Sequence, residues 1–243
     1  MSAQLAILAV VIVAAQTVET ITGFGATVIA LALGAQIFPV ETLVMALVLI
    51  GLPQSLWIVA RGWRHLDRRT LLLKILPLCG AGLAAGRLLE GRLDGAQLKL
   101  ALGIFVIAVS SVELARLVRN SGRTAPMPRM AGGAVLLGGG FVHGIFATGG
   151  PLIVYYASRA IPDKAAFRVT LSVLWLILNV TLCVTWLAGP GIKPESLLIA
   201  AWMIAPLAAG IVLGELLHGR INDLVFRKVV QALLLIIGVL LVV

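Results

Sequence analysis

Two side chains that can exchange protons lie inside long apolar stretches of this sequence. Glu19 is the only charged residue in the stretch 1–40, and His143 lies in the stretch 130–158, which contains no Lys, Arg, Asp or Glu. If these stretches lie in a bilayer, a charge there costs about 3 kcal/mol or more, which makes such residues functional candidates. We interpret both as candidate proton acceptors, since carboxylate and imidazole groups accept protons. The alternative for each is a structural hydrogen bond that secures the local backbone.

The composition shows where such stretches must lie. Of the 243 residues, 60% are hydrophobic and 12% are charged, whereas about 25% are charged in typical soluble proteins. A soluble globule of this size cannot bury that much apolar surface. The composition excludes a soluble enzyme, a disordered chain and a secreted disulfide scaffold. It predicts an all-α polytopic membrane protein with spans of about 20 residues each.

Glycines interrupt the two stretches that carry Glu19 and His143. The first contains Thr22-Gly23-Phe24-Gly25, and the second contains Thr148-Gly149-Gly150-Pro151. Glycine permits backbone angles that break a helix, and proline suits the first position of a new one. We therefore expect 5–37 and 131–158 each to form a helical hairpin that returns to its starting side. The N-terminus of the second helix in each hairpin would present free amides and a positive dipole end to an anion.

Neutral polar residues in the following helices are candidate ligands for such an anion. Hydroxyls and amides bind oxyanions by hydrogen bonds, although helix-to-helix hydrogen bonding in lipid is the alternative reading. A shift of 124 residues pairs Glu19 with His143, Gly25 with Gly149, and Ser55 with Asn179. The predicted substrate-binding residues are Gln16, Glu19, Thr20, Thr22, Gly23, Gly25, Gln54, Ser55, His143, Thr148, Gly149, Gly150 and Asn179. The tryptophans, Trp57, Trp63, Trp175, Trp186 and Trp202, are expected to anchor helices at the membrane interface.

The two halves of the chain resemble each other. The segment 82–92 matches the segment 210–220 at an offset of 128, with six identical positions. Both begin with a GxxxG pair, which we interpret as a helix-packing device. The match predicts a first membrane repeat over 1–118, a basic cytoplasmic linker over 119–129 and a second repeat over 130–243, as in many secondary transporters.

The basic residues discriminate between two topologies. If 5–37 and 131–158 each cross once, the 19 Lys and Arg divide 10 to 9 between the two sides, which gives no orientation. If both segments are hairpins, the division becomes 15 to 4, and the positive-inside rule places both termini outside. Each half is then a glycine-broken hairpin followed by three spans, and the two repeats are inverted. Because the net charge of +9 is spread over these short loops, it does not indicate nucleic-acid binding.

These residues resemble a known family. Two apolar repeats, each opening with a broken segment (Ile21-Thr22-Gly23-Phe24-Gly25 and Phe146-Ala147-Thr148-Gly149-Gly150-Pro151) and closing on a GxxxG helix, are similar to the TauE/SafE sulfite exporters. The resemblance spans nearly the whole chain. It implies movement of sulfite, organosulfonates or related small anions across the cytoplasmic (inner) membrane.

The leading hypothesis is a secondary transporter that exports a small sulfur oxyanion held at half-helix N-termini near the bilayer midplane. The chain contains no Gly-Lys dipeptide, so a Walker A motif is absent, and we expect no cofactor and no metal. One alternative is an intramembrane enzyme that uses Glu19 and His143, although no HExxH or GxSxG motif supports it. Another is a non-transporting subunit of a larger complex. The expected partners are the anion and the lipid bilayer, with a homodimer as one further possibility.

Overall fold

The computed structural model describes residues 2–22, 24–118 and 127–217, together with residues 232, 234–236, 238, 239, 241 and 242 near the end of the chain. Within these residues the backbone is helical with short connections and contains no strand, so the predicted all-α architecture is confirmed. Residues 119–126 of the predicted linker and residues 218–220 of the repeated segment lie outside the described part.

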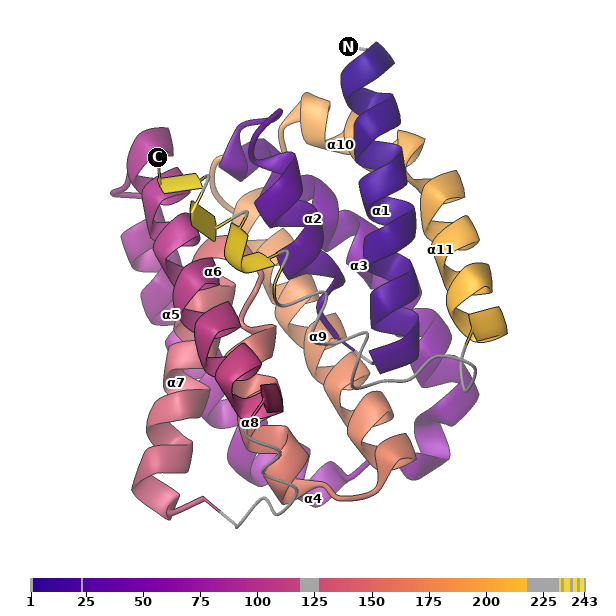
Figure 1. Cartoon of the computed structure of the whole chain (residues 1–243). Helices are drawn as coiled ribbons and strands as arrows, with labels where there is room; N and C mark the ends of the chain where they lie inside the picture. Colours follow the sequence, from indigo (N-terminus) through magenta and orange to yellow (C-terminus); the bar gives the residue numbers. More distant parts are fainter. Residues whose placement is uncertain are drawn as a thin grey trace.

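The predicted breaks divide the chain into two helical hairpins and several longer helices (Figure 1). The first hairpin is α1 (Ser2–Thr22) and α2 (Ala26–Gly34), and the second is α7 (Arg129–Phe146) and α8 (Gly150–Ala160). The other α-helices are α3 (Val40–Gly62), α4 (Arg68–Thr70), α5 (Leu76–Glu90), α6 (Gly95–Val118), α9 (Lys164–Leu187), α10 (Pro194–Trp202) and α11 (Ile204–Leu217). A 3-10 turn, η1 (Trp63–His65), and a π-helical turn, η2 (Leu71–Ile75), lead from α3 into α5.

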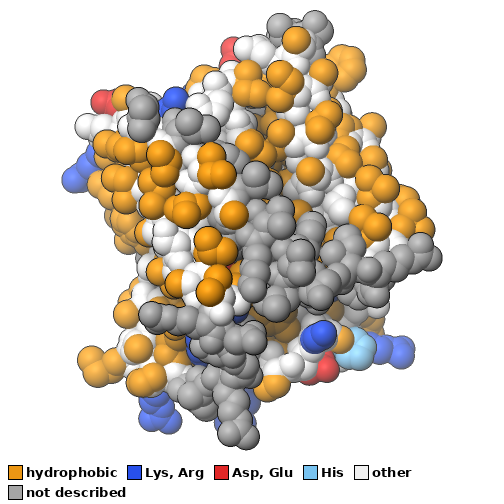
Figure 2. Space-filling model, viewed as in Figure 1, with side chains coloured by type: hydrophobic (Ala, Val, Ile, Leu, Met, Phe, Trp, Pro, Cys, Tyr) orange, Lys and Arg blue, Asp and Glu red, His pale blue; other side chains and the backbone are white. Residues whose placement is uncertain are grey.

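Most of the long helices are apolar enough to cross a membrane. Within the described residues, five segments meet the length and hydropathy of a span: Ala3–Ile21, Val40–His65, Arg68–Glu90, Gly95–Val118 and Lys164–Leu187. The pair α10 and α11, which is bent by 43°, meets them together. On the face drawn in Figure 2, the described side chains across the middle are mostly apolar, and the charged side chains lie toward the two ends, as a bilayer requires.

Three helix pairs organise the bundle. The helices α3 and α9 pack together between the pair α1 and α11 on one side and the pair α5 and α7 on the other (Figure 1). Glycines allow the two outer pairs to approach closely. A Cβ on Gly82 would overlap the carbonyl oxygen of Leu137, and a Cβ on Gly210 would crowd that of Val13. The prediction that both GxxxG segments pack helices is therefore confirmed.

The contacts of the two outer pairs correspond residue by residue. Gly86 lies against Gly144 of α7, and Gly214 lies against Thr20 of α1. Gly86 and Gly214 are 128 residues apart, and Thr20 and Gly144 are 124 apart, which are the offsets of the sequence comparison. In both pairs the residue numbers increase together along the contact, so α1 runs parallel to α11 and α5 runs parallel to α7.

Ion pairs identify the helix ends that share a face of the molecule. At one end, Glu41 at the start of α3 contacts Lys193 at the start of α10. At the opposite end, Arg168 at the start of α9 contacts Glu215 at the end of α11. Helices α3 and α9 are therefore antiparallel. Because α11 runs toward the Arg168 face and α5 runs away from it, their parallel partners α1 and α7 enter the bundle from opposite faces.

The tryptophan prediction is wrong for two of the five residues. Trp57, Trp63 and Trp202 are exposed on the outer surface, where an interfacial anchor belongs. Trp175 and Trp186 are buried inside the bundle instead. Both lie on α9, whose central position buries one face of the helix along much of its length.

Candidate functional site

A cavity lies where the two hairpins meet the central helices. It has about 540 Å³ of space free of protein atoms, part of it open to solvent. Its walls come from α1, α2, α3, the break between α7 and α8, and α9. Nine predicted binding residues line it: Gln16, Glu19, Gly25, Gln54, Ser55, His143, Thr148, Gly150 and Asn179. Residues from the two halves of the chain, between 88 and 163 positions apart, thus meet at one site.

Glu19 forms a hydrogen bond across the break between α1 and α2. Its Oε2 accepts a hydrogen bond of 2.9 Å from the backbone N–H of Ala26, the first residue of α2. Gly25 has φ of 107°, a left-handed conformation that an L side chain rarely adopts, and it lets the chain turn back toward the carboxylate. An acidic group at a helix N-terminus satisfies a free amide and interacts favourably with the helix dipole. The structural hydrogen bond, one of the two alternatives for Glu19, is therefore present.

His143 is held by two neighbours on α9. Its Nε2 lies 3.1 Å from Oδ1 of Asn179, and its ring stacks on Trp175 with centroids 5.7 Å apart and planes at 14°. Since an amide oxygen only accepts, Nε2 is the donor and Nδ1 of the neutral ring is left as an acceptor. His143 thus also makes a structural hydrogen bond, but to another helix and not to its own hairpin.

Several buried polar atoms at the cavity have no hydrogen-bond partner in the part of the chain that the structure describes. They are Oε1 of Gln16, Nε2 of Gln54, Nδ1 of His143 and Oγ1 of Thr148. All four residues are at most 3% exposed. Leaving such an atom unpaired costs about 1–3 kcal/mol, so the cavity is built to receive a polar occupant.

The electrostatic character of the site comes from the backbone and not from basic side chains. Glu19 is the one acid among the described lining residues, and no Lys or Arg is among them. The N-termini of α2 and α8 both begin at the cavity, at Gly25 and Gly150. Glu19 occupies the α2 end, whereas the α8 end has no carboxylate among the described lining residues. The cavity can therefore bind an anion through amides, hydroxyls and a helix dipole.

The structure does not bring every predicted residue to the cavity. Thr20 is buried against Gly214 and contributes to helix packing. Gly149 lies so close to the carbonyl oxygen of Gly139 that a Cβ would overlap it, so its role is to let α8 fold back on α7. The structure describes only the backbone of Thr22, and Gly23 lies outside the described residues.

Sequence analysis missed several lining residues, although helical periodicity could have found some of them. Leu47, Gly51 and Ser55 follow one another at intervals of four on α3, and Trp175 and Asn179 do so on α9. Residues at this spacing share one helix face. The remaining lining residues that were missed lie at the breaks or on α2: Phe24, Thr27, Val28 and Ala147.

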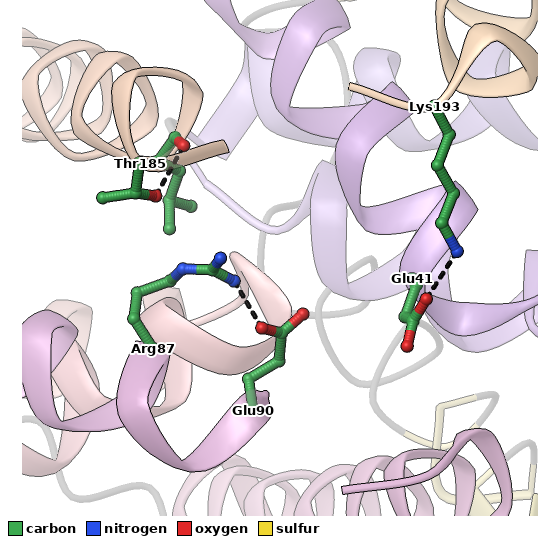
Figure 3. A network of polar contacts seen from close by, with 6 residues as sticks. Glu41, Arg87, Glu90, Thr185 and Lys193 are labelled. Carbon is green, nitrogen blue, oxygen red and sulfur yellow. Dashed lines mark hydrogen bonds and ion pairs between the residues drawn. The ribbon is translucent and has the colours of Figure 1, made fainter. Parts of the chain in front are cut away.

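Figure 3 shows a separate polar cluster that includes Glu41, Arg87, Glu90 and Lys193. Glu41 and Lys193 place it at the end of the molecule opposite Arg168. Arg87 forms an ion pair of 2.6 Å with Glu90 at the end of α5, and its guanidinium lies 5.7 Å from the centre of the Trp186 ring. Lys193 and Glu41 form the neighbouring pair at 2.5 Å. None of these residues lines the cavity, so the cluster ties together the ends of α3, α5, α9 and α10.

Comparison with known proteins agrees with this architecture. The chain is 26% identical over 193 residues to the probable inner membrane transporter protein TsaS of Comamonas testosteroni, which covers 79% of each chain. No solved structure matches this chain. The apolar helices and this relative identify a multi-pass protein of the inner membrane. A family model for the sulfite exporter TauE/SafE matches residues 7–241, and the chain therefore belongs to that family of membrane transporters.

Proposed function

We propose that this transporter exports a small sulfur oxyanion, such as sulfite or an organosulfonate, through the cavity between the two hairpins. The observation that carries the proposal is the set of unpaired polar atoms on Gln16, Gln54, His143 and Thr148 within the described structure. These atoms lie on residues that line a space shared by two helix N-termini. An oxyanion with several acceptor oxygens would supply partners for the donors among them.

The cavity-lining groups are suited to bind the anion strongly enough to select it and weakly enough to release it. Nε2 of Gln54 and the hydroxyl of Thr148 are donors, and the α8 N-terminus adds a positive dipole end. Hydrogen bonds to a charged partner contribute about 1.5–3 kcal/mol each. A buried lysine or arginine would hold the anion more tightly and would be left costly and unpaired after release.

Two inverted repeats would explain how the cavity opens to each side in turn. The matching contacts of Gly86 and Gly214 support a duplicated unit, and the opposite directions of α1 and α7 support its inversion. The proposed units are residues 1–118 and 130–243. In transporters built this way, one repeat rocks against the other around a fixed central site. Both termini then lie outside, and the loops with 15 of the 19 basic residues face the cytoplasm.

Export follows from the sign of the membrane potential. With the interior negative, each exported negative charge gains about 2.3 kcal/mol per 100 mV. Proton coupling is a further part of the proposal, in which Glu19, His143 or both accept a proton during transport. Flux into or out of vesicles between about pH 5.5 and about pH 8 tests it. A pH profile that stays unchanged in Glu19→Gln and His143→Gln would remove the proton role and leave anion transport intact.

Purified protein in liposomes tests the transport proposal with a matched pair of variants. Thr148→Val removes a cavity hydroxyl that is unpaired within the described residues, whereas Thr181→Val removes an exposed hydroxyl that donates to the carbonyl oxygen of Ile177 in its own helix. Sulfite flux should saturate and should fall about tenfold or more in the first variant, since a hydrogen bond to an anion is lost. Equal fluxes in the two variants would show that the anion does not pass Thr148.

A further inference from the structure

We propose that the carboxylate of Glu19 is a tethered competitor of the transported anion: it occupies the N-terminus of α2, and the anion must displace it to bind there. This inference rests on the proposed transport of an anion through the cavity. It assigns Glu19 a role beyond capping a helix. The role follows from three observations on the lining: where the carboxylate lies, what stands at the corresponding place in the other hairpin, and which atoms are left unpaired.

The position of the carboxylate is the position that an anionic ligand would take. Oε2 of Glu19 accepts from the backbone N–H of Ala26 over 2.9 Å, at the open end of α2. Both Glu19 and Gly25, the residue that precedes α2, line the cavity. The α2 helix has nine residues, and its free amides and dipole favour one negative group at this end. While Glu19 accepts from Ala26, its own carboxylate is the negative group at this helix end.

The second hairpin lacks this internal anion. A shift of 124 residues places His143 opposite Glu19 and Gly150 opposite Ala26. The His143 ring does not bond to its own hairpin, because Nε2 is directed to Asn179 and the ring stacks on Trp175. The α8 end is therefore open to an external anion, while the α2 end is filled. The two helix ends face one cavity but are not equivalent.

The unpaired atoms indicate that the cavity is incomplete without a ligand. Gln16 lies one turn before Glu19 on α1, and Gln54 lies across the cavity on α3. Each amide has a buried atom without a partner among the described residues, and both side chains are nearly inaccessible. The unpaired atom of Gln54 is its donor Nε2, whereas that of Gln16 is its acceptor Oε1. Nε2 of Gln54 could donate to an anion at the α2 end only after Glu19 leaves Ala26, because two negative groups repel in so small a space.

The substitution Glu19→Gln distinguishes a carboxylate that competes with the anion from one that only caps the N-terminus of α2. The glutamine side chain keeps an oxygen that can accept from Ala26, so a merely structural role predicts an unchanged affinity for the anion. The competitor role predicts that the variant binds sulfite about tenfold or more tightly, because the fixed negative charge is gone. The matched control is Glu195→Gln, which removes one exposed negative charge in the first turn of α10, away from the cavity.

Binding is measured by calorimetric titration of the purified protein in detergent with sodium sulfite, and then with thiosulfate, sulfoacetate and taurine. Tighter binding in Glu19→Gln, with Glu195→Gln unchanged, supports the proposal. Equal affinity in wild type and Glu19→Gln overturns the competitor role while leaving the transport proposal standing. If neither wild type nor Glu19→Gln binds any of the four compounds, both proposals fail together.

A second comparison applies if Glu19→Gln does not fold. His143→Glu introduces a carboxylate at the corresponding place beside α8, and His143→Gln is its neutral control. The competitor mechanism predicts that sulfite binds to His143→Glu about tenfold or more weakly than to His143→Gln. Equal affinities would show that a tethered carboxylate at a hairpin end does not exclude the anion, and would overturn the proposal.

Discussion

Nε2 of His143 lies 3.1 Å from Oδ1 of Asn179, and this hydrogen bond joins the second hairpin to the central helix α9. Trp175, one turn before Asn179 on the same helix, stacks on the imidazole ring. One hydrogen bond and one stacking contact thus fix the ring between them. The orientation of this cavity-lining side chain is therefore set by α9 and not by the hairpin that carries it.

Loss of the acceptor on Asn179 should destabilise the protein. In Asn179→Ala the buried Nε2–H of His143 has no partner, which is expected to lower the free energy of unfolding by about 1–3 kcal/mol. Thermal unfolding in detergent measures the effect. The control is Thr181→Ala, an exposed residue two positions further along α9 whose hydroxyl bonds to its own helix. Equal stability of the two variants would contradict the anchoring role of Asn179.

Close packing of α5 on α7 should be sensitive to a single methyl group. A Cβ on Gly82 would overlap the backbone of α7, whereas a Cβ on Gly80 would meet nothing within 4 Å. We expect Gly82→Ala to destabilise the protein by about 1–3 kcal/mol through overpacking. Gly80→Ala should be neutral or stabilise by up to about 1 kcal/mol, since alanine favours the helix. A lower unfolding temperature for Gly82→Ala than for Gly80→Ala would confirm the close packing of α5 on α7. A lower unfolding temperature for Gly80→Ala would refute it.

Asp67 should make the stability of the connection between α3 and α5 depend on pH. The backbone N–H of Thr70 donates to Oδ1 of Asp67 over 2.9 Å, and this bond, followed by one from the Thr70 side chain, lowers the pKa of the carboxyl below its ordinary value. Because its pKa is lower in the folded state, the Asp67 carboxylate stabilises the fold at pH values above its unfolded pKa of about 3.9. This stabilisation is lost as the pH falls through the pKa of the folded state.

The variant Asp67→Ala should therefore lose about 1 kcal/mol at neutral pH, as is usual for a lost helix cap. Its difference from wild type should shrink as the pH falls below about 4. Unfolding followed at several pH values in detergent measures both effects. Asp67→Asn keeps a side-chain oxygen at the cap without the titrating group and is the control. A difference between wild type and Asp67→Ala that grows in acid would contradict this account of the cap.

The proposed orientation predicts which loops a membrane-impermeant thiol reagent reaches from outside. In a background with Cys79→Ala and Cys183→Ala, a cysteine introduced by Gly91→Cys lies between α5 and α6, on the proposed outer side. One introduced by His65→Cys lies in η1, on the proposed cytoplasmic side. Intact cells should label the first, and only permeabilised cells should label the second. The opposite pattern would contradict the proposed orientation and would place both termini inside.

The architecture was predictable because its signals are local or repeated in the sequence. The hairpins follow from the glycines around Gly25 and Gly149, and the packing of α5 and α11 follows from the GxxxG segments. Glu19 and His143 stood out as titratable groups in apolar runs. An offset read from the sequence even paired Ser55 with Asn179, which line the same cavity.

The contacts within the site were not predictable, because they join helices distant in the chain. No spacing rule indicates that Asn179 accepts from His143 or that Trp175 stacks on it, so Trp175 was misassigned to the interface. The packing of Gly149 against Gly139 was not predictable for a related reason. The sequence does not distinguish a glycine that leaves space for a substrate from one that leaves space for the carbonyl oxygen of Gly139. Only the packing of α8 on α7 shows which it is.

The central claim, that the cavity between the hairpins carries a sulfur oxyanion, is tested most directly by the flux of labelled sulfite from liposomes containing the purified protein. Thiosulfate, sulfoacetate and taurine are added in turn as competitors. The account predicts a saturable flux that at least one of them reduces and that Gln54→Leu, which removes an unpaired cavity donor, slows about tenfold or more. A flux no greater than that of protein-free liposomes, or one indifferent to Gln54, would contradict it.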